Sequence, residues 1–191
     1  MRKISSTLKL LGEKIKQVSS HRFLGVCFDD RLQWSKHFEE MIGSATPRIN
    51  ALKRIAAKSL WRHPSWILKL HDSVVNSIWN FGSLVYCTAS QDLWDKITKV
   101  HARSIKAYCG VPSFVGYATL CDNMGIKTIR EELMSFGRKR LTAIAAYTPF
   151  GPEIISKRRN NVTGLYKSPS EVLLTDQDVA AFQNAQGTFS N

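Results

Sequence analysis

The chain has 191 residues, 43% of them hydrophobic, which is enough for one domain with a real core or for one domain plus a tail. Its 27 Lys and Arg against 15 Asp and Glu give a formal charge of +12, a balance that favours a polyanion, mostly nucleic acid or an anionic membrane surface. The alternative is a soluble protein that is basic by chance. No signal peptide or bilayer-spanning apolar run is visible, so we expect an intracellular chain, nuclear or cytoplasmic, with no membrane partner.

The basic excess is confined to the first three quarters of the chain. Residues 1–60 carry 12 basic and 5 acidic side chains, residues 61–150 carry 11 and 6, and residues 151–191 carry 4 and 4. After Gly151 the hydrophobic periodicity fades, and Ser, Asn, Gln, Thr and Gly dominate. We therefore expect residues 151–191 to form a poorly ordered polar tail, with at most a weak helix over residues 173–182.

The four cysteines lie far apart in the sequence, and no His stands at zinc-finger spacing from them. We expect buried free thiols in a reducing compartment and no metal site. The four are Cys27, Cys87, Cys109 and Cys121.

Residues 1–33 begin with two strand-like runs. Residues 9–18 carry a turn signal at Gly12-Glu13, and residues 23–28, FLGVCF, are rich in strand-forming residues. Ser19-Ser20 lies between the two runs and suggests the connection of a short antiparallel hairpin. Because an isolated hairpin is marginally stable in water, it must pack on the following helices or on a sheet outside this chain.

From Ser35 the hydrophobic period becomes helical, with Ser35 as a plausible N-cap. Lys36, Arg54 and Lys58 fall opposite the apolar stripe. Pro47 removes a backbone donor and crowds the Gly43 carbonyl, so we expect a kink or break there. The stripe consists of Phe38, Met41, Ile42, Ala45, Ile49, Leu52 and Ala56.

Pro64 is placed to open a second helix that Gly82 ends or bends. Ser90 precedes a third helix, which Gly110 and Pro112 close. The expected stripe of the second helix is Leu70, Val74, Ile78 and Phe81. The expected face of the third is Leu93, Ile97, Val100, Ser104 and Tyr108.

A short helix is expected around residues 118–123, ending at Gly125. Thr128 and Glu131 form a capping box that opens a last helix through about Tyr147. The stripe of that last helix would contain Ile129, Leu133, Phe136, Ile144 and Tyr147. The fold class is therefore mainly α: an N-terminal antiparallel β-hairpin, a bundle of four to five helices over residues 34–150, and the tail.

Asp29-Asp30 is the only Asp-Asp pair, and CFDD has the outline of the Y-x-D-D box of reverse transcriptases. A two-metal site needs a further carboxylate from another strand, and the preceding segment offers only Glu13. Cys27 also stands where an aromatic residue is usual. The favoured interpretation is the polar end of a strand before a helix.

No other motif indicates catalysis. His37 with Glu40, and the contiguous His71-Asp72, lack the spacing of known metal motifs and suit surface or core histidines. Phosphate-binding glycine loops and a nucleophile elbow are absent. We assign no catalytic residue, no metal ligand and no cofactor to this chain.

Basic clusters interleaved with aromatic residues are more informative. They occupy residues 53–63, 138–140 and 157–159. Lys and Arg neutralise phosphates, and aromatic rings can stack on bases or fill the core. The alternative for each cluster is a solvated helix face.

The sequence RFLGVCFDDRLQWSKHFEEMIGSATPRINALKRI resembles the stretch just after the palm in reverse transcriptases of non-LTR (LINE-type, jockey-like) retrotransposons. That family has an aromatic residue with Leu-Gly-Val, then Asp, Leu-x-Trp and His before a helix. The matching residues are Phe23, Leu24, Gly25, Val26, Asp29, Leu32, Trp34 and His37. GEKIKQV, VVNSIWNFGSLVY, KVHARSIKAYCGVP and LCDNMGIKTI are similar to further parts of the family, and the resemblance covers about residues 9–130.

The resemblance implies that the hairpin is a primer grip and that the helices form a thumb. Phe23, Leu24 and Gly25 would then hold the primer terminus, and Lys36, Arg54 and Lys58 would contact phosphates without reading sequence. The partner would be an RNA/DNA template–primer duplex, with the missing palm of the same polyprotein as a possible second partner. Magnesium would belong to that palm.

The family is an RNA-directed DNA polymerase, but the catalytic aspartates would precede residue 1. The chain is expected to be inactive alone, as a fragment or a decayed copy. Two alternatives stay open: a helical protein-interaction module derived from such an element, or a copy with no independent function. A continuous basic surface favours nucleic acid, and a broad apolar patch favours a protein.

Overall fold

A computed structural model describes residues 9–58, 65–147 and 169–187. The chain is mainly helical, with β-hairpins at its N-terminal end, which confirms the expected fold class. In chain order the elements are β1 (Lys9–Leu10), β2 (Glu13–Lys14), β3 (Ser20–Phe23), β4 (Val26–Asp29), α1 (Ser35–Lys58), α2 (Ser65–His71), η1 (Asp72–Asn76), α3 (Ser77–Asn80), α4 (Ser83–Tyr86), α5 (Gln91–Cys109), α6 (Tyr117–Met124), α7 (Ile129–Tyr147), α9 (Pro169–Leu173) and α10 (Asp176–Gly187).

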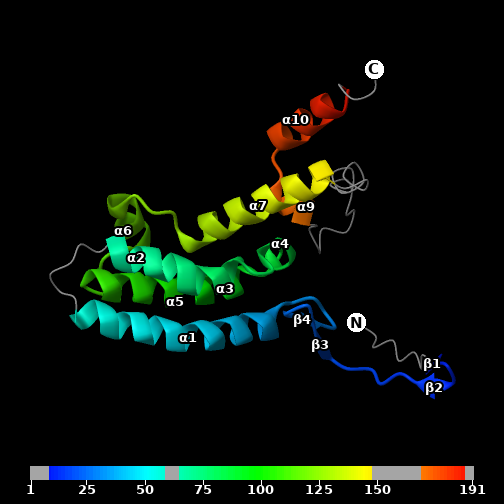
Figure 1. Cartoon of the computed structure of the whole chain (residues 1–191), viewed down its shortest axis with the longest axis horizontal. Coiled ribbons are helices and arrows are strands. Elements are labelled where there is room, and N and C mark those ends of the chain that lie inside the picture. Colours follow the sequence, from blue (N-terminus) through cyan, green and yellow to red (C-terminus); the bar gives the residue numbers. More distant parts are fainter. Residues whose placement is uncertain (1–8, 59–64, 148–168, 188–191) are drawn as a thin grey trace.

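The helices form layers along one long axis (Figure 1). α1 lies along one side, α7 lies along the other, and α5 runs between them with α2 and α3. One hydrophobic core joins these layers. Its largest fully buried side chains include Phe38, Trp79, Tyr86, Trp94 and Ile97.

The N-terminal strands form two hairpins, so the expected single hairpin between residues 9–18 and 23–28 is wrong in its pairing. β1 pairs with β2 around Leu11-Gly12, and β3 pairs with β4 around Leu24-Gly25. Both turns have positive φ at both central residues, 50° and 87° in the first and 46° and 83° in the second. This is the type I′ geometry whose twist suits two-residue hairpin loops. Each Leu-Gly pair therefore closes a local hairpin, and Ser20 lies within β3 and not in a connection.

α1 runs without a break through Pro47, so the expected break is wrong. Pro47 and Gly43 both lie on the exposed side of the helix, where water can hydrate the carbonyl that loses its donor. The opposite side holds the helix in place by burial. Its buried residues are His37, Phe38, Met41, Ala45, Ile49 and Leu52.

The buried face of the second helical segment differs from the expected one. Leu70, Val74 and Phe81 are exposed. The core receives the residues at every fourth position, namely Ile67, His71, Val75 and Trp79. The segment is also divided into α2, a π-helical turn η1, and α3. The stripe was misplaced because a histidine, His71, occupies a core position that the apolar pattern alone does not reveal.

The later helices begin and end where local signals predict. Ser90 precedes α5, and Gly110 and Gly125 close α5 and α6 with φ of 63° and 64°. At the start of α7 the Thr128 N–H donates to Glu131 Oε2 at 2.9 Å, and the Glu131 N–H donates to Thr128 Oγ1 at 3.4 Å. These contacts confirm the capping box.

The stripe expected along α7 is only partly right. Ile129 and Leu133 are buried, whereas Ile144 is exposed and Leu141 and Ala145 take the core positions. Along α5 most of the expected face is buried.

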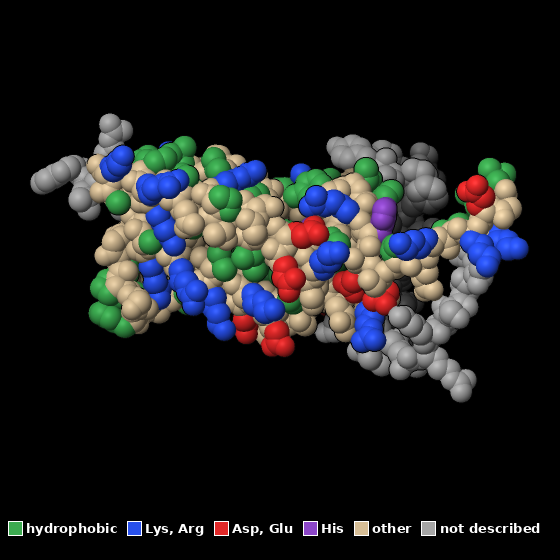
Figure 2. Space-filling view, turned by 90° about the horizontal axis from the view of Figure 1, so that it is seen from below, with side chains coloured by type: hydrophobic (Ala, Val, Ile, Leu, Met, Phe, Trp, Pro, Cys, Tyr) green, Lys and Arg blue, Asp and Glu red, His purple; other side chains and the backbone are tan. Residues whose placement is uncertain are grey.

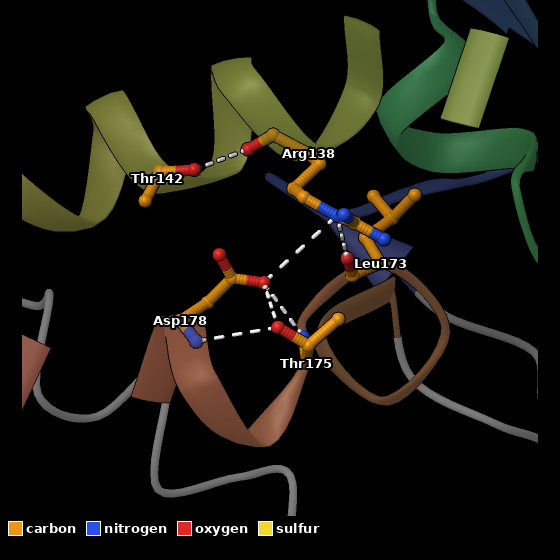
Figure 3. A network of polar contacts seen from close by, with 5 residues as sticks. All are labelled: Arg138, Thr142, Leu173, Thr175 and Asp178. Atoms are coloured by element: carbon orange, nitrogen blue, oxygen red, sulfur yellow. Dashed lines mark hydrogen bonds and ion pairs between the residues drawn. The ribbon is translucent and has the colours of Figure 1, made fainter. Parts of the chain in front are cut away.

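Part of the segment expected to be a tail is helical. Leu173, the last residue of α9, and Leu174 after it are buried with Leu141 and Ala145 of α7. Gly137 allows this close approach, since a Cβ there would lie 3.2 Å from a methyl of Leu173. Figure 3 shows the polar contacts around this packing. The boundaries at residues 33 and 150 stay a prediction.

Candidate nucleic-acid interface

The outward side of α1 presents two of the cations singled out from the sequence. Arg54 and Lys58 are exposed, one helical turn apart, with Ile55 between them. Together with Ala51 they line a shallow hollow of about 270 Å³. Within the described residues neither cation forms an ion pair.

α5 carries a second row of cations, which the sequence reasoning missed. Lys96, Lys99, Arg103 and Lys106 follow a spacing of three, four and three residues, so they share the side opposite the buried stripe. Lys96, Lys99 and Arg103 are exposed, and Lys106 is half-buried. That spacing was the signal that could have revealed the row.

The two rows lie on neighbouring helices that run toward the same end of the molecule. After Glu40 in α1 and after Asp95 in α5, neither helix contains an acidic residue. We call the exposed surface of these two stretches the basic face. Its members are Arg48, Lys53, Arg54, Lys58, Lys96, Lys99, Arg103 and Lys106. In Figure 2, Lys and Arg gather where α1 ends, whereas Asp and Glu lie nearer the hairpins.

Lys36 is exposed on the same side of α1 but lies apart from the basic face. At 1.5 Å per residue it is roughly 27 Å along the helix from Arg54. Its Nζ donates to Ser20 Oγ of β3 at 2.8 Å. Nearby, Arg22 forms an ion pair with Glu40 at 3.2 Å. Positive charge at this end is therefore partly neutralised.

Phe23, Leu24 and Gly25 form the tip of the second hairpin. Phe23 is 61% exposed and Leu24 is 79% exposed. A Cβ at Gly25 would lie 2.7 Å from a ring atom of Phe81, so the backbone of the turn lies directly on that ring. Only glycine combines this approach with a φ of 83°. The structure thus places the three residues together, away from Arg54 and Lys58.

Asp29 ends β4 and organises the turn into α1, as the favoured interpretation of the Asp-Asp pair predicts. Its Oδ1 accepts the Arg31 and Gln33 N–H groups at 3.1 and 2.8 Å, and its Oδ2 accepts the Trp34 N–H at 2.7 Å. Three backbone donors therefore occupy this carboxylate. Trp34 is buried against the hairpin and α1, which anchors the start of the helix.

Two core histidines belong to a buried hydrogen-bond network. His71 Nδ1 lies 3.2 Å from the Tyr108 hydroxyl, and His101 Nδ1 lies 2.8 Å from that of Tyr117. The Tyr117 hydroxyl accepts the Ile129 N–H at 2.9 Å, so it can donate its proton to His101. Burial lowers the pKa of His71 to about 4 and that of His101 to about 3. Both are neutral at physiological pH and add no charge to the basic face.

A carboxylate pair lies beside these histidines, at a cavity of about 290 Å³. Asn76 Nδ2 donates to Asp72 Oδ1 at 2.9 Å and to Glu132 Oε1 at 3.0 Å. Burial, reinforced by the charge of Asp72, raises the pKa of Glu132 to about 7. Within the described residues no three His, Cys, Asp or Glu side chains cluster closely enough to hold a metal ion.

His37 is also a core residue, since its Nδ1 accepts the Cys27 N–H at 3.3 Å. Burial is the main cause that lowers its pKa. The four cysteines are free, and burial raises the pKa of the Cys87 thiol to about 12. No described helix has the length and hydropathy of a bilayer span.

The cluster at residues 138–140 is only partly available. Arg138 Nε donates to the Leu173 carbonyl at 2.8 Å and lies 3.9 Å from Asp178 Oδ2, which ties α7 to α9 and α10 (Figure 3). Arg140 lies over the Phe136 ring at 4.6 Å. Residues 157–159 and Trp61-Arg62-His63 lie outside the described residues.

The fold and the site together define a mainly helical protein with one strongly basic face. Over 134 residues the chain is 22% identical to the probable RNA-directed DNA polymerase from transposon BS of Drosophila melanogaster. The match covers 68% of the chain and 14% of the fly protein. No family model and no solved structure matches. The likeness supports a relationship to transposon reverse transcriptases.

Proposed function

We propose that the chain is a thumb-like part of a transposon reverse transcriptase that binds the template–primer duplex and does not catalyse synthesis. One observation carries the proposal: α1 and α5 pack against each other, and each carries exposed cations in a stretch that contains no acidic residue. Such a surface neutralises phosphates and releases their counterions. Its contacts position a duplex without reading its sequence.

The hairpin end would serve as the primer grip. Phe23, Leu24 and Gly25 form one exposed turn, and Lys36 lies beside the same hairpin. In this proposal the tip contacts the primer terminus, while Arg54 and Lys58 contact phosphates roughly 27 Å or more further along. A duplex long enough to reach both ends would be required for full affinity.

The test is a comparison of two matched double variants in binding to a fluorescent RNA/DNA heteroduplex. Arg54→Glu with Lys58→Glu reverses two charges on the basic face. Lys139→Glu with Arg140→Glu reverses two exposed charges on α7, on the opposite side of the molecule. We expect the first pair to weaken binding about 100-fold and the second less than threefold in low salt. Equal losses for the two pairs would refute the assignment.

The absence of catalysis is tested separately. The purified chain, given magnesium, dNTPs and a primed template, should extend no primer, since its Asp29 is held by three backbone donors. Template-dependent synthesis would contradict the proposal.

A second candidate function rests on the apolar side chains exposed at the hairpins. These are Leu10, Leu11, Ile15, Val18, Phe23 and Leu24. Exposed apolar groups that are frequent in one part of a chain can mark protein contacts. This end would then dock a protein, such as the palm of the same polyprotein. Loss of that contact in a Leu11→Ser, Leu24→Ser variant, with heteroduplex binding kept, would support docking at the hairpins.

A further inference from the structure

The loop between α5 and α6 holds a phenylalanine at its tip. Phe114 is 87% exposed, the most exposed aromatic side chain among the described residues. Gly110 ends α5 in a left-handed conformation, and Pro112 prevents the helix from continuing. The Val115 N–H donates to the Pro112 carbonyl at 3.3 Å, which makes Ser113 and Phe114 the central residues of a tight turn. The ring therefore projects from a closed turn.

The turn is anchored on both sides, which argues against collapse of the ring into the core. Val111 and Val115 are half-buried against the main hydrophobic core. The Val111 N–H also donates to the Lys106 carbonyl at 2.9 Å. Apolar burial is thus provided by the flanking valines, while Phe114 between them points outward. The turn therefore keeps this aromatic ring in contact with water.

The same turn lies at the end of the α5 row of cations. Lys106 Nζ donates to the Ser113 carbonyl at 2.8 Å, which fixes the last cation of the row next to Phe114. Arg103 and Lys99 follow at helical spacing along the same side of α5. Figure 2 shows exposed hydrophobic side chains at this end of the molecule, beside the Lys and Arg.

We propose that Phe114 is a stacking platform for an unpaired base of the nucleic acid bound by the basic face. This proposal rests on the proposed function and narrows its ligand to a duplex with a single-stranded extension. A charged row that follows the phosphates and ends in an exposed aromatic ring is the combination that binds single strands. The extension would leave the duplex along Lys99, Arg103 and Lys106 and place a base on the ring. Every base has a π-face, so no sequence preference is expected.

A protein partner fits this site less well. In the same turn Pro112 and Ser113 are exposed, and Lys106 donates to the Ser113 carbonyl, so a cation is held beside the ring. The charge around the ring is positive, which complements a phosphate backbone.

The experiment compares a blunt heteroduplex with the same duplex carrying a four-nucleotide extension that contains 2-aminopurine. We expect Phe114→Ala to weaken binding of the extended duplex roughly 10-fold and to abolish quenching of the 2-aminopurine, while blunt-duplex affinity changes less than twofold. Phe114→Trp should restore both signals. Ile144→Ala, at an exposed apolar side chain of α7 on the opposite side of the molecule from α1, is the control and should leave both ligands unaffected.

The outcomes separate the two proposals. If Phe114→Ala binds the extended duplex like the wild type, or weakens both ligands equally, the stacking platform is wrong. In either case, sensitivity of blunt-duplex binding to Arg54→Glu with Lys58→Glu would still uphold the basic face. If the wild type binds neither ligand, the proposed function fails and the platform fails with it.

Discussion

The hairpin end and the basic face differ in how they treat charge. At the hairpins, Lys36 is hydrogen-bonded to Ser20, Arg22 is paired with Glu40, and the Asp29 carboxylate is held by backbone donors. At the ends of α1 and α5, exposed cations follow one another with no acidic residue in either stretch. The first arrangement stabilises a local fold, and the second accumulates positive potential. An excess of positive charge without acidic partners marks a binding surface better than any single Lys or Arg.

The core between the two ends contains titratable residues that are kept neutral. His71 and His101 are buried, hydrogen-bonded to tyrosines and neutral. Protonation of these two histidines should cost stability, whereas the basic face lies on the surface and away from the core. Stability and binding should therefore respond to different changes.

The largest effect is expected from Phe38, a core residue on which both ends depend. Its ring is fully buried, with centroids 5.3 Å from Tyr86 and 6.0 Å from Trp94. Phe38→Ala should lower the free energy of unfolding by about 3–5 kcal/mol because of the cavity that it leaves. Phe23→Ala, at the exposed hairpin tip, is the matched control and should change it by less than about 0.5 kcal/mol. Urea denaturation measures both, and equal effects would show that the core is misassigned.

Lowering the pH should reduce the stability of the fold through the buried histidines, which are not part of the basic face. The pKa of His71 is about 4 in the folded chain against an ordinary value of 6.5, so between these pH values the unfolded chain binds a proton that the folded chain does not. Stability should then fall as pH drops through this window, by roughly 3 kcal/mol for His71 alone. His101 acts in the same direction down to about pH 3.

Glu132 should oppose this loss. Its pKa is about 7 in the folded chain against an ordinary value of 4.5, so between pH 7 and 4.5 the folded chain holds a proton that the unfolded chain lacks. Glu132→Gln removes this opposing contribution, and the decline in stability from pH 7 to 4.5 should become steeper than in the wild type. Denaturant midpoints at several pH values measure the two slopes. Identical slopes would show that Glu132 does not titrate in this range.

A smaller effect is expected at the turn before α1. Asp29→Ala leaves three backbone N–H groups without their acceptor and should lower the free energy of unfolding by about 1–3 kcal/mol. Asp30→Ala, at the exposed neighbouring position, should change it by less than about 0.5 kcal/mol. Heteroduplex affinity should be unchanged in both variants at a temperature where each is folded. A matching loss for Asp30 would contradict the role given to Asp29.

The smallest effect is expected in heteroduplex affinity, when one cation is removed from the basic face or from the hairpin end. Arg54→Ala should weaken heteroduplex binding by roughly 3- to 10-fold, whereas Lys36→Ala should weaken it no more than about twofold. The difference is expected because Lys36 already donates to Ser20 and has Glu39 and Glu40 nearby on α1. Fluorescence anisotropy at fixed salt measures both, and a larger effect at Lys36 would move the interface to the hairpin end.

Features encoded locally were predictable from the sequence, and features set by packing were not. Gly110, Gly125 and the Thr128 capping box end or start helices through contacts within a few residues, and each was placed correctly. The predicted pairing of the strands was wrong because each of the two Leu-Gly turns closes a separate hairpin. The predicted buried face of the segment from α2 to α3 was wrong because a histidine fills a core position.

In the candidate site, too, the locally encoded features were predictable and those set by packing were not. Arg54, Lys58 and Lys36 were predicted to lie outward on α1, and all three are exposed. That Lys36 belongs to a different end of the molecule required the contact with β3. The row on α5 joins Arg54 and Lys58 only because α1 packs along α5, a contact between residues about 45 positions apart. The spacing of Lys and Arg in the sequence can reveal a row of cations along one helix, but it cannot reveal which other helix packs beside that row.

The central claim is that phosphates are bound by the basic face, and salt dependence tests it most directly. The measurement is the slope of log affinity against log salt for an RNA/DNA heteroduplex, in the wild type and in a variant with Arg54, Lys58, Lys99 and Arg103 changed to Gln. Each lost phosphate contact should reduce the slope by about 0.9, so the variant's slope should be smaller by roughly 3 to 4. An unchanged slope in a folded variant would contradict the account.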